Sequence, residues 1–412
     1  MMIAEAARRV PHVAFFDALG TLTESDAEWR PMSAGLLMLR LLDSWLANAS
    51  DQHSDFDQEI RAVREAVNAV PSGTPVRGIL SGIVDAIEQL PIREVRPIAP
   101  RLMAYGRSLE YEAAWRLATD VYETIVAYTH PAIEPEMTID ATMRMAFCFR
   151  TLGEMASAEL AYKRAGSLAA AVGDSAKMLH ARIGDAKMAL VRGNLPAAES
   201  ILDDTLAKAK TVGAKHVLAM AFHERATVAH ARGEHERAIR FAYDALRLTH
   251  SLRERDRVLF DLSTFFMDSN VFVAARDALM VLAATAQEQY VRLAATVNLM
   301  EIAAREGSEP IFELYRRQLA TADLPLAIEV RVHYCTGLGY SAFGHLDSAM
   351  EQLEQARDLA ARHSLNQQTF EAEALLADVR RGARLQRNTA VDVPESVYDV
   401  AEAMSDLRAQ LV

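Results

Sequence analysis

The stretch GEMASAELAYKRA, residues 153–165, recurs in altered form near the C-terminus as GHLDSAMEQLEQA, residues 344–356. Both stretches have Gly at the first position, Ala five residues later and a large side chain nine residues later. Four segments between them follow a similar pattern. The centres of all six are Gly153, Gly193, Gly233, Asn270, Gly307 and Gly344, at intervals of 40, 40, 37, 37 and 37 residues. A repeat of this length indicates stacked copies of one structural unit.

The pattern within each repeat predicts a helical hairpin. Gly or Asn at the centre fits a left-handed residue that ends the first helix. Small residues seven positions before and five positions after the centre allow two antiparallel helices to cross closely. Apolar residues elsewhere recur at intervals of three and four, which is the helical period. The fifth repeat matches least well, because Met300, Phe312 and Arg316 occupy its pattern positions.

This pattern resembles the tetratricopeptide repeat over about residues 135–380. The resemblance implies an all-α fold, an α-solenoid of antiparallel helix pairs that forms a tetratricopeptide-like superhelix. The family unit is about 34 residues long, so the longer intervals here imply extended helices or longer loops. Because the family's Pro after the second helix is missing, related arrays of helical hairpins remain an alternative.

The breaks along the chain predict three regions. Residues 1–94 form an N-terminal helical bundle or degenerate capping repeats, with helices at about 2–19, 31–49, 54–69 and 76–90. Residues 95–382 form the repeat array, which includes one more hairpin at 95–130 and a helix near 366–382. Residues 383–412 contain an acidic C-terminal helix near 395–411, which caps the array or docks elsewhere.

Composition limits the function. The chain has 412 residues, a net charge of −12 and a pI of about 5.5, which argues against a nucleic-acid partner. It has neither a signal-like N-terminus nor an apolar run long enough to span a membrane, so we expect a cytoplasmic location without a membrane partner. Cys148 and Cys335 are the only cysteines and lie far apart, which predicts core residues rather than a disulfide or metal site. We expect no cofactor. The preference for Arg over Lys is typical of a GC-rich bacterial genome.

The resemblance also implies a binding surface. In the family, the first helix of each pair lines a concave groove, and positions ten, six and three residues before the turn centre point into it. Transferred to this chain, these positions select Met143, Phe147, Arg150, Ile183, Lys187, Leu190, His223, Thr227, His230, Phe260, Thr264, Met267, Glu301, Tyr334 and Leu338. The same register contains Val297, Ala304 and Ser341. A largely apolar lining of this kind suits an amphipathic helix or an extended peptide.

One segment suggests catalysis. Residues 15–22, FFDALGTL, resemble the first motif of the haloacid dehalogenase superfamily, in which an Asp at the end of a strand is the nucleophile. That resemblance would make Asp17 the nucleophile of a hydrolase. The family also needs a Lys on an α/β sheet, whereas the first Lys here is Lys163, inside the repeats. The competing interpretation is a helix that ends at Gly20.

Two charged patterns allow more than one interpretation. His216, His223 and His230 recur every seven residues on one predicted helix, so neighbours are about 10 Å apart and cannot share one metal ion. We therefore expect partner contact or partial burial for them. Residues 232–257 are rich in Arg, with Glu and Asp between the arginines. This pattern predicts a salt-bridged helix face or a docking patch for an acidic partner.

The sequence thus favours a non-catalytic scaffold or adaptor that binds a protein or peptide in a concave apolar groove. The first alternative is a peptide-responsive regulatory receptor, and the second is the hydrolase that uses Asp17. Self-association stays open, because the ends of repeat arrays commonly need capping.

Overall fold

The computed structural model describes residues 11–47, 53–90, 94–363, 365–382 and 391–411. Within these ranges the chain forms twenty α-helices and one short 3₁₀ helix, and no strand. Successive helices pack against one another as antiparallel pairs, which confirms the predicted fold class. The chain divides into two compact units, residues 1–201 and 202–412.

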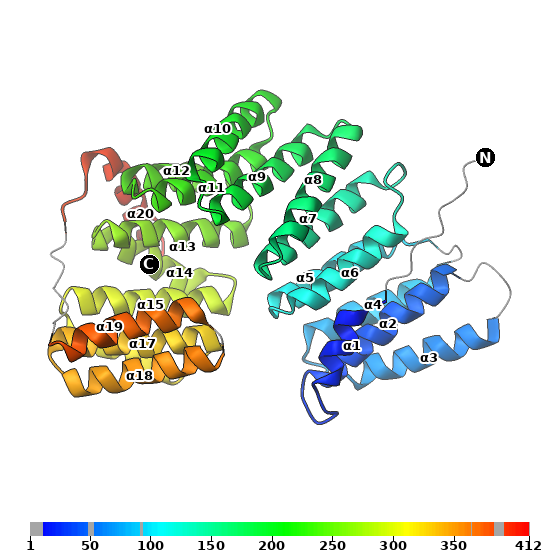
Figure 1. The fold of residues 1–412 in the computed structure, drawn as a ribbon, viewed down its shortest axis with the longest axis horizontal. Helices are drawn as coiled ribbons and strands as arrows, with labels where there is room; N and C mark the ends of the chain where they lie inside the picture. The colour runs from blue at the N-terminus through cyan, green and yellow to red at the C-terminus, as the bar shows by residue number, and fades with distance from the viewer. Residues whose placement is uncertain (1–10, 48–52, 91–93, 364, 383–390, 412) are drawn as a thin grey trace. The chain divides into compact units, whose positions relative to one another are not determined.

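Unit 1 begins with four helices that precede the regular hairpins (Figure 1). They are α1 (Val13–Gly20), α2 (Trp29–Ala47), α3 (His53–Ala69) and α4 (Pro75–Gln89). The hairpin helices follow as α5 (Ala99–Tyr111), α6 (Trp115–Tyr128), α7 (Pro135–Thr151), α8 (Met155–Ala171) and α9 (Ser175–Val191). Helix α10 (Leu195–Val212) runs through the boundary between the units.

In unit 2, as in the hairpins of unit 1, the first helix of a hairpin alternates along the chain with the second. Its helices are α11 (Lys215–Ala231), α12 (His235–Leu248), α13 (Leu252–Asp268), α14 (Phe272–Thr285), α15 (Gln289–Arg305), α16 (Glu309–Ala320), α17 (Leu326–Phe343), α18 (Leu346–Arg362) and α19 (Asn366–Arg380). The short helix η1 (Glu395–Val397) and α20 (Tyr398–Ala409) complete it.

The turn within each hairpin has the predicted left-handed residue. Gly153 has φ 79° and Asn270 has φ 58°, and the four other predicted centres also have positive φ. Next to the first of these turns, the Glu154 amide donates to the Phe149 carbonyl at 2.8 Å, which satisfies a carbonyl at the end of α7.

Three further turns of this kind escaped the sequence pattern. Ala113, with φ 58°, lies between α5 and α6, forty residues before Gly153, so the hairpin predicted at 95–130 shares the repeat register. Gly173 and Gly213 also have positive φ and connect one hairpin to the next.

Small residues and large ones interlock at the helix crossings. A Cβ atom built on Gly106 would lie 2.6 Å from the ring of Tyr122, so only Gly fits there. The poorly matching fifth repeat follows the same rule with the sizes exchanged. Phe312 is fully buried where the other repeats have Ala, and Gly339 of α17 leaves room for its ring. The deviation in one helix is therefore compensated in the next.

A buried polar cluster joins the N-terminal helix α1 to the rest of unit 1. His12, directly before α1, lies with Nδ1 2.6 Å from Asp120 and Nε2 3.2 Å from Asp43. The Tyr128 hydroxyl donates to the second oxygen of Asp43 at 2.7 Å. Both ring nitrogens face carboxylates, an arrangement that favours the doubly protonated, positively charged imidazole. The predicted helix at 2–19 is described only from residue 11 onward, and α1 starts at Val13.

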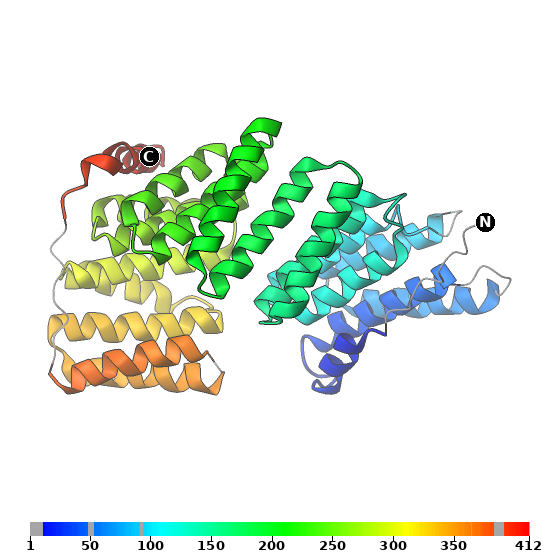
Figure 2. The same cartoon turned by 45° about the horizontal axis from the view of Figure 1, so that its top comes forward.

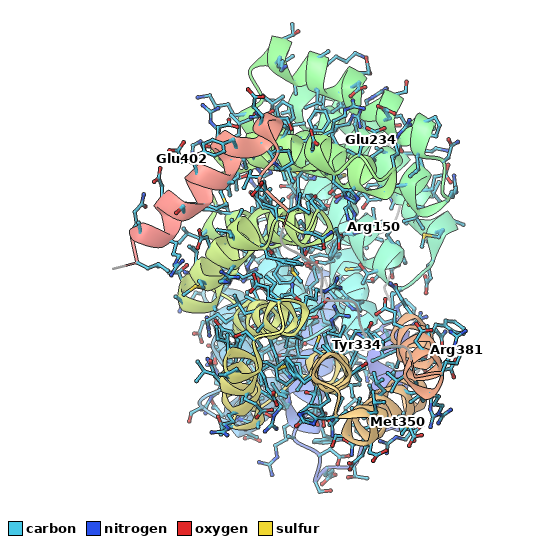
Figure 3. The ribbon with its side chains drawn as sticks, turned by 90° about the vertical axis from the view of Figure 1, so that its left-hand side faces the viewer. Arg150, Glu234, Tyr334, Met350, Arg381 and Glu402 are labelled. Carbon is cyan, nitrogen blue, oxygen red and sulfur yellow. The ribbon has the colours of Figure 1, made fainter. Side chains whose placement is uncertain are left out.

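The C-terminal helix α20 packs against α14 and α12 and not beside α19 (Figures 1 and 2). Val397, Val400 and Met404 are fully buried in this contact. Arg240 of α12 pairs with Asp399 at 2.7 Å, while Glu402 lies on the outer side of α20 (Figure 3). The capping role expected for residues 383–412 stays a prediction.

No described helix combines the length and the apolar character needed to cross a lipid bilayer.

Candidate functional site

The predicted contact positions lie on the first helices α7 and α9 in unit 1 and α11, α13, α15 and α17 in unit 2. We call the sides of these helices that carry the predicted positions the first-helix faces. The predicted residues that remain partly exposed are Phe147, Arg150, Lys187, Leu190, His223, Thr227, His230, Phe260, Thr264 and Tyr334. The predicted residues that are buried are Met143, Ile183, Met267, Glu301 and Leu338. The buried positions belong to the core of their units. A role in partner contact stays a prediction for all of these residues.

In unit 1 an aromatic and cationic cluster forms on α7. The ring of Phe147 makes an edge contact with Trp115 of α6, with 5.6 Å between ring centroids. Arg144 and Arg150 lie one turn before and after Phe147, and their guanidinium carbons are 4.9 and 5.4 Å from its ring centroid. Cation–π contact of this kind holds both arginines against the ring.

Arg144 also neutralises a buried carboxylate. Its Nε donates to Glu110 of α5 at 2.9 Å, and the hydroxyl of Tyr122 donates to the same oxygen at 2.8 Å. The thiol of Cys148 lies 3.8 Å from this oxygen. Cys148 is fully buried, and burial raises the pKa of its thiol to about 11, so it is a core residue as predicted.

In unit 2 the three predicted histidines of α11 each pair with an acidic residue of α13, thirty-eight positions further along the chain. His223 and Asp261 are 2.7 Å apart, and so are His230 and Asp268. The third pair, His216 and Glu254, is longer at 3.6 Å. The acidic residues repeat every seven positions on α13, as the histidines do on α11. We call this arrangement the His–acid ladder.

Each histidine contacts a carboxylate of the next first helix, and no group of His, Cys, Asp and Glu among the described residues is arranged to hold a metal ion. The sequence analysis missed the partners, although the matching seven-residue spacing of Glu254, Asp261 and Asp268 was a visible signal.

A second buried carboxylate lies between α15 and α17. Glu301 receives hydrogen bonds from Arg305 Nη2 at 2.6 Å and from Arg331 Nη2 at 2.7 Å. Burial opposes its charge, but the charges of Arg331 and Arg305 outweigh burial and lower the pKa of Glu301. Glu301 was predicted to face a partner, whereas here its carboxylate is fully engaged within the unit. Cys335 lies 3.7 Å from Glu301 and is also fully buried.

Tyr334 of α17, which is labelled in Figure 3, contacts Arg331 of this cluster. The guanidinium carbon of Arg331 is 5.0 Å from the centroid of the Tyr334 ring. An open cavity of about 500 Å³ adjoins Arg331 where α17 meets the start of α19. Its other lining residues are Leu365, Asn366, Gln367, Gln368 and Glu371.

The hydrolase interpretation of residues 15–22 is wrong in its structural context. Asp17 lies in helix α1 and is exposed, whereas the motif needs an Asp at the end of a strand. The helix ends at Gly20, as the competing interpretation predicted.

The arginine-rich stretch at 232–257 forms ion pairs, as predicted. Arg232 and Arg237 both pair with Glu234, and Arg253 pairs with Glu288 at 2.7 Å. Arg240 reaches Asp399 of α20 at 2.7 Å. The acidic helix that docks on this stretch is therefore a segment of the same chain.

Comparison with known proteins finds distant structural similarity. No protein-family model matches the chain, and no curated protein matches it. Among solved structures, a Rap protein complexed with competence and sporulation factor is 10% identical, covers 88% of this chain and 100% of its own, and has a TM-score of 0.46. The apo form of the quorum sensor NprR from B. thuringiensis is 12% identical, covers 90% and 92%, and has a TM-score of 0.44. BtubC from P. vanneervenii is 15% identical, covers 55% and 89%, and has a TM-score of 0.37.

Proposed function

We propose that this chain is a non-catalytic, cytoplasmic scaffold that binds a protein or peptide on its first-helix faces. One observation supports this most strongly. Phe147 in unit 1 and Phe260 and Tyr334 in unit 2 remain partly exposed after their helices have packed. Aromatic side chains are the usual anchors of protein recognition, because burying them against a partner stabilises the complex by a large area of contact.

The residues around these aromatic side chains favour binding of a specific partner over non-specific hydrophobic association. Arg150 lies beside Phe147, and Thr264 follows Phe260 by one helical turn, so charged and hydrogen-bonding groups border each apolar anchor. An apolar centre with polar groups around it is the usual composition of a recognition surface. An amphipathic helix or an extended peptide fits such a surface.

The His–acid ladder favours a peptide-responsive receptor as a second candidate. It joins the first helices of two successive hairpins, α11 and α13, through paired side chains that are partly exposed. A ligand that binds these side chains competes with the pairs and thereby changes how the two hairpins are held together. The same surface would then both bind a peptide and report its presence.

The proposal can be tested by affinity capture from a lysate of the native organism. Captured proteins are identified by mass spectrometry, and a purified candidate is then titrated calorimetrically against the wild type and a Phe147→Glu/Phe260→Glu variant. We expect the variant to lose affinity by roughly tenfold or more, because each change places a charge at an apolar anchor.

Leu160→Glu is the matched control. Leu160 is 71% exposed on the second helix α8, so the same kind of change is made away from the first-helix face. Circular dichroism checks that each variant is folded. If the double variant binds as the wild type does, or if Leu160→Glu weakens binding equally, the first-helix faces are not the binding surface.

A further inference from the structure

Arg150 is paired with no carboxylate among the described residues, whereas Arg116 and Arg144 of the same unit are paired. No ion pair joins Arg150 to a described acidic residue, and its Nε is buried without a hydrogen-bond partner. Its only described contact of electrostatic character is the ring of Phe147, 5.4 Å from the guanidinium carbon to the ring centroid. A guanidinium that is paired with no carboxylate can donate to a ligand that brings one.

Two acidic residues in this part of unit 1 are already paired. Glu154, four positions further along the chain, binds Arg116 of α6 at 2.9 Å. Glu110 accepts hydrogen bonds from Arg144 and Tyr122. These two carboxylates therefore form their described contacts with groups other than Arg150.

We propose that Arg150 and Phe147 form a recognition site for a partner segment in which an Asp or Glu side chain adjoins an apolar residue. The carboxylate accepts from the guanidinium of Arg150, and the apolar residue packs on Phe147 and Trp115, which are both partly exposed. Arginine suits this role because its planar donors match the two oxygens of a carboxylate. The inference rests on the proposed function and names the class of partner that unit 1 selects.

The test is a selection of short random peptides displayed on phage and fused through their C-termini, so that every available carboxylate belongs to a side chain. The intact chain is the immobilised target. Selected peptides are synthesised with amidated C-termini, and their affinities are measured by fluorescence polarisation. We expect the selected peptides to be enriched in Asp or Glu next to an apolar residue, compared with the unselected library.

Variants then locate the contact. We expect Arg150→Gln to lower the affinity of an acidic peptide by roughly tenfold or more, and Arg150→Lys to lower it less. Replacing the peptide's acidic residue by its amide should cause the same loss in the wild type and no further loss in Arg150→Gln. Arg164→Gln is the control, because Arg164 is an exposed arginine on the second helix α8. A purely structural role for Arg150 is tested by thermal unfolding, which we expect Arg150→Gln to leave unchanged.

The outcomes separate this inference from the proposed function. Peptides that bind without acidic enrichment, or whose affinity is equal in Arg150→Gln and the wild type, overturn the inference and leave the scaffold function standing. A selection that yields no binder to any part of the chain contradicts both. Acidic peptides that lose the same affinity in Arg164→Gln indicate general attraction to positive charge and also overturn the inference.

Discussion

The two units bury a glutamate in the same way but neutralise it differently. In each unit the glutamate lies on a first helix, and the next first helix provides an arginine and, one turn later, a cysteine. These residues are Glu110, Arg144 and Cys148 in unit 1, and Glu301, Arg331 and Cys335 in unit 2.

The two glutamates differ in their remaining hydrogen-bond partner. Glu110 receives its other hydrogen bond from the neutral hydroxyl of Tyr122, whereas Glu301 receives it from a second cation, Arg305. Glu301 is 3% exposed and is held by two guanidinium groups, and Glu110 is 8% exposed and is held by one. A repeat array therefore tolerates a buried charge where the neighbouring first helix supplies the opposite one, and we expect the number of cations to set how much the charge contributes to stability.

The largest expected effect comes from removing these charges. We expect Glu301→Gln to destabilise unit 2 by about 3 kcal/mol, because two partly buried arginines lose their carboxylate. Glu110→Gln should destabilise unit 1 by about 2 kcal/mol, since one arginine is affected. Hydrogen exchange of α15 and α17 in the first variant, and of α5 and α7 in the second, measures the local free energies of opening.

Glu313→Gln is the control for this comparison. Glu313 pairs with Arg316 at 2.9 Å near the surface of α16, so its loss should cost less than about 1 kcal/mol. If Glu110→Gln lowers the local free energy of opening as much as Glu301→Gln does, the number of cations is not what distinguishes the two units.

The two units should also respond to pH in opposite directions. Burial disfavours the charged form of His12 in unit 1, but hydrogen bonds to Asp120 and Asp43 outweigh burial and raise its pKa to about 9. A raised pKa contributes stability that is complete below about pH 6.5 and is lost as pH rises through about 9. At about 1.4 kcal/mol per pKa unit, the contribution is about 3 kcal/mol. The lowered pKa of Glu301 has the opposite sign, so unit 2 should lose stability as pH falls below the usual range of a glutamate.

Hydrogen exchange of α1 between pH 7 and pH 10, corrected for the intrinsic dependence of exchange on pH, measures the alkaline effect. Asp43→Asn should move the loss of protection to lower pH, because one of the two carboxylates that stabilise the imidazolium is removed. Protection of α1 that stays constant up to pH 10 would contradict a charged His12.

Much of the fold could be predicted from the sequence because its determinants are local. The turn residues Gly153 and Gly344 need only a positive φ, and the alanines five positions later need only a close helix crossing. Ala113 escaped detection because Ala carries no turn signal, although its spacing from Gly153 matches the repeat. Phe312 was recognised as a deviation, but its compensation by Gly339 depends on contact with the following first helix.

The candidate site was less predictable because burial depends on packing between repeats. The family register selected Phe147 and Glu301 at equivalent positions, yet Phe147 is partly exposed and Glu301 is buried. The register cannot distinguish them, since Glu301 is covered by Arg331 of the next first helix. The docking of α20 on α14 and α12 joins segments more than a hundred residues apart, and no local pattern indicates it.

Substitutions at the hairpin turns should change the stability of the two units least. Unit 1 has Ala113 and unit 2 has Asn270 at left-handed positions where the other hairpins have Gly. The left-handed conformation costs an L-residue such as Ala roughly 1–2 kcal/mol, while Gly loses about 0.5–1 kcal/mol more entropy on folding, so Ala113→Gly should stabilise unit 1 by up to about 1 kcal/mol. Asn tolerates this conformation through local hydrogen bonds, so Asn270→Gly should change stability by less than about 0.5 kcal/mol. Urea unfolding followed by circular dichroism measures both variants, with Gly153→Ala as the converse control that should destabilise. A loss of stability in Ala113→Gly would mean that the methyl group of Ala113 contributes more than its backbone conformation costs.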